Sequence, residues 1–129
     1  MSLCLLSLTL SSLAEDSSTA DPYRDYWLVY VHYCSSDFWS GTASASEATA
    51  GYNFLGRHIV EAVVQDLTDN YNLLAATTVV LTGCSAGAAG VALNCDEVAS
   101  KVPDADFRCV AGFLKNSSFY AKHFCRRCS

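Results

Sequence analysis

The sequence has few basic residues and no long apolar run. Its 129 residues contain 8 Lys and Arg against 13 Asp and Glu, which gives a formal net charge of −5. This acidic balance argues against a nucleic-acid partner, because contacts with the phosphate backbone need clustered Lys and Arg. No stretch approaches the roughly 18 consecutive apolar residues of a membrane-spanning helix. The sequence therefore predicts neither nucleic-acid binding nor a transmembrane segment.

Charged residues are scarce as well, at 16% against 51% hydrophobic residues. This composition excludes a disordered chain, and the length favours a single domain with a modest core. The apolar start, residues 1–14, lacks the Lys or Arg that normally opens a secretory signal. A signal peptide and an internal piece of a domain are both open interpretations. The expected organisation is a leader or irregular segment over 1–25, a partial domain over 26–112 and an irregular tail over 113–129.

Seven cysteines are many for a cytosolic protein and favour an oxidising, secreted or extracellular location. Cys125 and Cys128 have C-x-x-C spacing. A second pair and a thioredoxin-like context are missing, so this spacing does not indicate a metal or redox site. We expect no cofactor and no metal.

The central part of the chain alternates strand and helix patterns. Apolar, β-branched or aromatic runs predict strands at about 26–32, 77–82 and 107–111. Helical periodicity predicts helices at 53–67 and 86–100. This β-α-β-α-β order implies an α/β fold whose strands are parallel neighbours joined by right-handed crossovers.

The segment Gly83-Cys84-Ser85-Ala86-Gly87 matches G-x-S-x-G between the second strand and the second helix. In that context the pattern indicates a nucleophile elbow, in which a strained turn exposes the serine hydroxyl. The amide of Ala86, at the start of the helix, would point toward a developing oxyanion. The alternative is a Gly-rich turn whose serine only caps the helix.

Three further blocks add specific motifs. They are Tyr-Cys-Ser-Ser-Asp-Phe-Trp-Ser-Gly at 33–41, Gly56, and Val-Ala-Leu-Asn-Cys-Asp-Glu-Val-Ala at 91–99. Together with the 83–88 segment, they resemble the pectin acetylesterase/Notum family, over roughly residues 11–112. The Ser-Ser-Asp-x-Trp form is similar to the Notum branch, whereas Cys84 before the serine is similar to the plant branch.

The resemblance implies a partial α/β-hydrolase-like parallel sheet and a serine carboxylesterase. Ser85 would be the nucleophile, with Ala86 and Gly87 at the oxyanion hole. The substrate would be an acylated polysaccharide or an acylated protein. Cys95 and Cys109 flank one helix-to-strand connection and would pair, as their counterparts in the plant branch do.

The chain also departs from the family pattern. The Gly-Gly-x-Trp stretch that supplies the family's other oxyanion donor is missing, and the family's catalytic Asp and His lie beyond the last residue. An internal triad could use His123 with one of four acidic residues, but the geometry of the fold argues against it. Those acidic residues are Asp96, Glu97, Asp104 and Asp106. We expect a central fragment that is inactive alone; the alternative is a non-catalytic remnant or binding module that retains the hydrolase-like core.

The loop that carries Ser36, Asp37 and Trp39 follows the first strand. It could line a substrate pocket at the carboxyl edge of the sheet. It could equally form a self-bonded Asx turn with the indole packed over the core.

Overall fold

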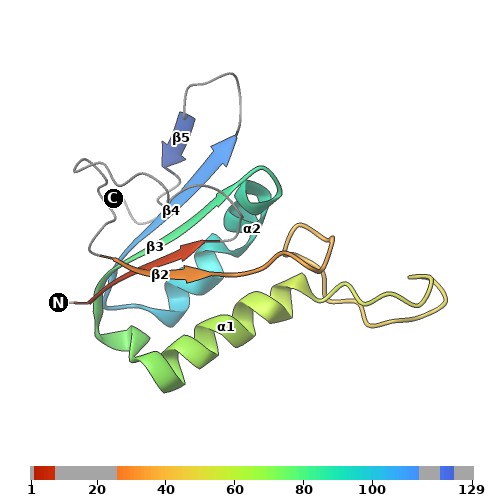
Figure 1. Cartoon of the computed structure of the whole chain (residues 1–129), viewed down its shortest axis with the longest axis horizontal. Coiled ribbons are helices and arrows are strands. Elements are labelled where there is room, and N and C mark those ends of the chain that lie inside the picture. Colours follow the sequence, from red (N-terminus) through yellow and green to blue (C-terminus); the bar gives the residue numbers. More distant parts are fainter. Residues whose placement is uncertain (1, 8–25, 114–119, 124–129) are drawn as a thin grey trace.

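The structure is a computed structural model that describes residues 2–7, 26–113 and 120–123 (Figure 1). Cys125, Cys128 and most of the 1–25 segment lie outside these residues. The elements in chain order are strands β1 (Ser2–Ser7) and β2 (Trp27–Tyr30), helix α1 (Gly56–Tyr71), a 3-10 turn (Leu73–Ala75), strand β3 (Ala76–Cys84), helix α2 (Ala86–Lys101), and strands β4 (Asp106–Phe113) and β5 (Tyr120–His123).

The five strands form one sheet in the order β2-β1-β3-β4-β5. Strand β1 pairs in parallel with β2 and with β3, β3 pairs in parallel with β4, and β5 runs antiparallel to β4. The prediction that the three expected strands run parallel is confirmed for β2, β3 and β4. The expectation that the first two predicted strands are neighbours is wrong, because β1 lies between β2 and β3. Strands β1 and β5 lie in residues 1–25 and 113–129, where the sequence pattern predicts no strand.

Helix α1 follows its apolar periodicity but ends later than predicted. Val60, Val64 and Leu67 are buried at i, i+4 and i+7, which is the spacing of one helix face. Asp69 and Asn70, which lie beyond the predicted end at residue 67, take part in hydrogen bonds with the side chains four residues earlier. The helix ends at Tyr71, and Asn72 caps it in a left-handed conformation (φ 55°) with its amide bonded to the carbonyl of Leu67.

Both helices pack on the same face of the sheet. One buried cluster joins apolar side chains of α1 and α2 to alternate residues of β3, Val79 and Leu81. Because side chains alternate along a strand, Val80 points to the opposite face, where it packs with Val110 and Tyr26. In the described part of the chain, no helix is long and apolar enough to cross a membrane.

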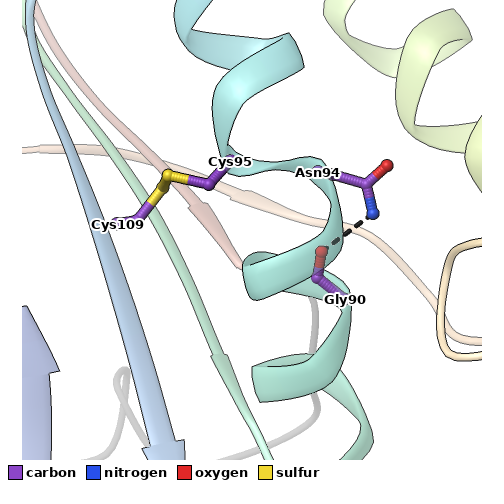
Figure 2. The surroundings of a disulfide bond; sticks show 4 residues. All are labelled: Gly90, Asn94, Cys95 and Cys109. Carbon is purple, nitrogen blue, oxygen red and sulfur yellow. Dashed lines mark hydrogen bonds between the residues drawn. A yellow bond between two sulfur atoms is a disulfide. The ribbon is translucent and has the colours of Figure 1, made fainter. Parts of the chain in front are cut away.

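Helix α2 is covalently attached to the sheet. The sulfur atoms of Cys95 and Cys109 are bonded, with their Cα atoms 6.2 Å apart. Figure 2 shows the bond running from α2 to β4. The family resemblance implies the same pairing.

The β2 edge of the sheet carries large apolar side chains in contact with solvent. Trp27 is 66% exposed, and Leu28 and Tyr30 are also exposed. They line a groove of about 1010 Å³ between β2 and the flank of α1. An edge strand of this composition is a pairing and aggregation hazard unless another segment covers it.

The disulfide gives a stability prediction. Its cysteines are 14 residues apart, and a closed loop of about 15 residues restricts the unfolded chain by about 3 kcal/mol. We expect the variant Cys95→Ala/Cys109→Ala to lose about that much free energy of unfolding, measured by urea denaturation without reductant. The matched control is Cys34→Ala, an exposed free thiol, which should keep the wild-type midpoint. Equal midpoints for the double variant and the wild type would contradict the prediction.

Candidate active site

The order of the strands creates a topological switch point at the carboxyl ends of β1 and β3. From β1 the chain crosses to β2 on one side, and from β3 it crosses to β4 on the other. In parallel sheets, ligands bind outside the carboxyl ends of the strands where the order reverses. Ser85 follows the carboxyl end of β3 directly, and the loop after β2 leaves the same edge.

Ser85 has an unusual backbone conformation, with φ 54° and ψ −117°. A non-glycine residue in this region is strained, and such strain persists only where the surroundings enforce it. The Ser85 amide donates to the carbonyl of Gly112 on β4 at 3.1 Å. The side chain is exposed and makes no capping hydrogen bond to α2. The alternative in which the serine serves as a side-chain helix cap is therefore contradicted.

Strand β3 and helix α2 approach each other closely on either side of Ser85. A Cβ atom added to Gly83 would overlap the backbone of Gly87, so the turn requires glycine at position 83. The amides of Ala88 and Ala89 donate to the Ser85 carbonyl at 3.0 and 3.3 Å. The Ala86 amide belongs to the first turn of a 16-residue helix, where backbone amides favour negative charge.

The loop after β2 is organised by the Asp37 carboxylate. Its Oδ1 accepts from Ser35 Oγ at 2.5 Å and from the Trp39 amide at 3.0 Å. Its Oδ2 accepts from the amides of Gly41 at 3.1 Å and Gly56 at 2.7 Å. Asp37 therefore joins its own loop to the amino terminus of α1.

These contacts set the ionisation of Asp37. Burial raises the pKa of the Asp37 carboxyl, but the hydrogen bonds outweigh burial, so its pKa lies below the ordinary value of 3.8. The Ser35 hydroxyl makes the largest lowering contribution and the Gly56 amide the next. The carboxylate is ionised at neutral pH and is committed to holding the loop.

Trp39 is fully buried. Its indole lies against Gly90 of α2, where an added Cβ would overlap the ring, and its ring centroid is 5.1 Å from that of Tyr33. In the part of the chain described, its Nε1 is a buried donor without an acceptor. With Asp37 bonded inward and Trp39 buried, the structure favours the self-bonded turn with a packed indole over a pocket lining. Ser36 is exposed, at φ 53°.

The acidic residues that follow Ser85 lie away from it. Asp96 is eleven residues along α2, about 16 Å at the helical rise. Asp106 begins β4 opposite Thr78, near the amino end of β3, and Asp104 precedes it. Glu97 contacts Arg57 of α1. The backbone of His123 pairs with Val110 on β4, two strands from β3.

His32 and the groove beside β2 both lie apart from Ser85. His32 is exposed and its ring packs edge-on against Tyr30 at 6.3 Å. The groove between β2 and α1 is lined by His32 but by neither Ser85 nor residues 35–41. That groove is therefore separate from Ser85.

Sequence reasoning missed Asn94. It is buried on α2, and its side-chain amide donates to the carbonyls of Trp39 at 2.9 Å and Gly90 at 2.8 Å. The available signal was a single amide on an otherwise apolar helix face, four residues after a glycine. The Trp39 partner is 55 residues away and has no local signature.

Fold and site together define an α/β protein with an exposed, strained serine at the switch point of a parallel sheet. The pectinacetylesterase family model matches residues 7–128. The chain belongs to this family.

Named relatives share its sequence. It is 40% identical over 90 residues to the planarian (Schmidtea mediterranea) palmitoleoyl-protein carboxylesterase NOTUM, covering 69% of the chain and 17% of the relative. It is 43% identical over 81 residues to the human protein of that name, covering 60% and 16%. It is 31% identical over 100 residues to pectin acetylesterase 11 of Arabidopsis thaliana, covering 77% and 25%. The chain thus spans a quarter or less of these relatives.

Asp37 generates a pH prediction. Its lowered pKa means that the unfolded chain binds the proton at a higher pH than the folded chain, so stability falls as pH drops below about 4. At pH 6, Asp37→Asn should lose about 1.5–3 kcal/mol, because the loop's donors lose a charged acceptor. Between pH 6 and pH 3 the variant should lose less further stability than the wild type, as measured by urea midpoints.

The matched control is Asp104→Asn, a change at an exposed position. It should retain the wild-type difference between the two pH values. An equal loss of stability in wild type and Asp37→Asn on acidification would contradict the assignment.

Proposed function

We propose that this chain is part of a serine carboxylesterase of the Notum/pectin acetylesterase type, with Ser85 as the nucleophile. The observation that carries the proposal is the conformation of Ser85, exposed at positive φ between β3 and α2. In an α/β-hydrolase-like sheet, that turn is the nucleophile elbow. Membership of a family whose named relatives are carboxylesterases supports the same role.

The proposed chemistry is acyl transfer. Ser85 Oγ attacks the ester carbonyl, its proton passes to a general base, and the alcohol leaves with a proton; water then releases the acid from the acyl-serine. The amide of Ala86, with Gly87 next to it, would stabilise the oxyanion at the positive end of α2. The close approach of Gly83 to Gly87 supports this, because it holds the first turn of the helix at the end of the strand.

The substrate class is an acyl ester, either a fatty acyl group on a protein or an acetyl group on a polysaccharide. The names of the relatives support both, as palmitoleoyl-protein carboxylesterases and as a pectin acetylesterase. The groove between β2 and α1 does not discriminate between them, because Ser85 does not line it. The Cys95–Cys109 bond supports an oxidising, secreted or extracellular location.

We further propose that these 129 residues alone have no appreciable turnover. The acidic residues after Ser85 lie along α2 or at the opposite end of the sheet, and Asp37 is committed to four hydrogen bonds. Without a base and its orienting acid, the serine hydroxyl is a poor nucleophile. This placement also favours the second candidate, a non-catalytic binding module that keeps the elbow as packing.

Labelling with an organophosphonate probe tests both the role of Ser85 as nucleophile and the inactivity of the chain alone. The chain alone should not be labelled stoichiometrically, because loss of even one oxyanion donor costs on the order of 100- to 1000-fold in turnover. With added imidazole as an external base, we expect mass spectrometry to find the label at Ser85. Ser85→Ala should abolish it, whereas the matched control Ser100→Ala, an exposed serine at the other end of α2, should not.

The two failures are distinct. No label at Ser85 in the presence of imidazole would contradict the nucleophile and favour the binding module. Stoichiometric labelling without imidazole would instead show that a base exists within the chain, and would overturn its predicted inactivity.

A further inference from the structure

We infer that Asp37, Trp39 and Asn94 form a clamp that fixes the orientation of α2, and with it Ser85 and the Ala86 amide, at the sheet edge. This inference rests on the proposed function, because it assigns positioning residues to the proposed nucleophile. None of the three is a reacting group. The clamp joins two elements that are far apart in the sequence but meet at the carboxyl edge of the sheet.

The loop side of the clamp is made rigid by Asp37. The carboxylate holds the Trp39 amide at 3.0 Å and the Gly56 amide at 2.7 Å, so Trp39 is fixed relative to the start of α1. Charge-assisted bonds of this kind are stronger than those between neutral groups. Trp39 itself has φ 64°, a conformation that its side chain and backbone would not hold without these contacts.

The helix side is made by Gly90 and Asn94, one and two turns beyond the first residues of α2. The indole of Trp39 occupies the space that a side chain at position 90 would fill. The Asn94 amide then bonds both to the carbonyl of Trp39 and to the carbonyl of Gly90. Because each donor–acceptor pair is buried and directional, rotation of α2 about its axis would break both the bond and the ring contact.

The opposite side of the helix is fixed by a different interaction. Figure 2 shows Cys95 pointing toward β4 and Asn94, the preceding residue, pointing to the other side of α2. The disulfide holds the helix to the sheet, and the amide holds it to the loop. A single tether allows a helix to turn about the point of attachment. Two tethers on opposite sides remove that freedom, and Ser85 lies at the end of the helix whose direction they set.

A purely structural role would only lower stability, so the test must report the geometry around Ser85. Three amides do so directly: Ser85, which bonds to Gly112, and Ala88 and Ala89, which bond to the Ser85 carbonyl. Their hydrogen-exchange rates, read by NMR on the oxidised chain, measure how firmly the turn is held.

The decisive variant is Asn94→Ser. A serine hydroxyl can bond to the carbonyl four residues earlier in its own helix, which keeps the Gly90 contact, but it is too short to reach Trp39. Exchange at the Ser85, Ala88 and Ala89 amides should become on the order of tenfold faster, while β3 amides such as that of Leu81 remain slow. Asp37→Asn, which loosens the clamp from the loop side and also lowers global stability, should accelerate these three amides by a larger factor than it accelerates the Leu81 amide.

The matched control is Val98→Ala, which removes buried volume from the same helix and leaves the clamp's hydrogen bonds in place. It should accelerate exchange along α2 and the sheet without preference for the Ser85 turn. The inference is overturned if Asn94→Ser and Asp37→Asn leave the three amides unchanged, or accelerate all amides as Val98→Ala does. Hydrogen exchange does not require Ser85 to react. The clamp can therefore be supported even if probe labelling contradicts the nucleophile, and the nucleophile can be supported even if hydrogen exchange contradicts the clamp.

Discussion

The loop at the carboxyl ends of the strands depends on the hydrogen bonds that the Asp37 carboxylate accepts. Its four hydrogen bonds hold a loop in which Ser36, Phe38 and Trp39 all have positive φ. Each such residue costs on the order of 1–3 kcal/mol. The charged acceptor offsets that strain, and the loop in return delivers a large aromatic ring to α2.

The surroundings of Ser85 combine two kinds of support. The sheet sets its position, since β3 leads into the turn and the Gly112 carbonyl holds its amide. The loop sets the direction of the helix that follows, through Trp39 and Asn94. Trp39 and Asp37 thus support the turn at Ser85 without lining a pocket. The Asp37 oxygens are hydrogen-bonded within the protein, and the Trp39 ring is buried against Gly90.

The sequence predicted what depends on local pattern. The β-branched run before Gly83 and the small residues after it predict β3, the turn and α2, and the apolar spacing of residues 59–67 predicts most of α1. It did not predict the order of strands, because the pairing of β1 with both β2 and β3 is a tertiary choice. Nor did it predict the Asn94 contact or the burial of Trp39, whose partners lie far along the chain.

The central place of β1 has a kinetic consequence. It is synthesised before both of its partners, and one of them, β3, begins about 70 residues later. Closing so long a loop is entropically costly and slows folding. On the ribosome, β1 and β2 therefore wait as an open pair with unsatisfied edges until β3 emerges. That interval, more than the finished fold, is when the nascent chain is exposed to misassembly and depends on chaperones.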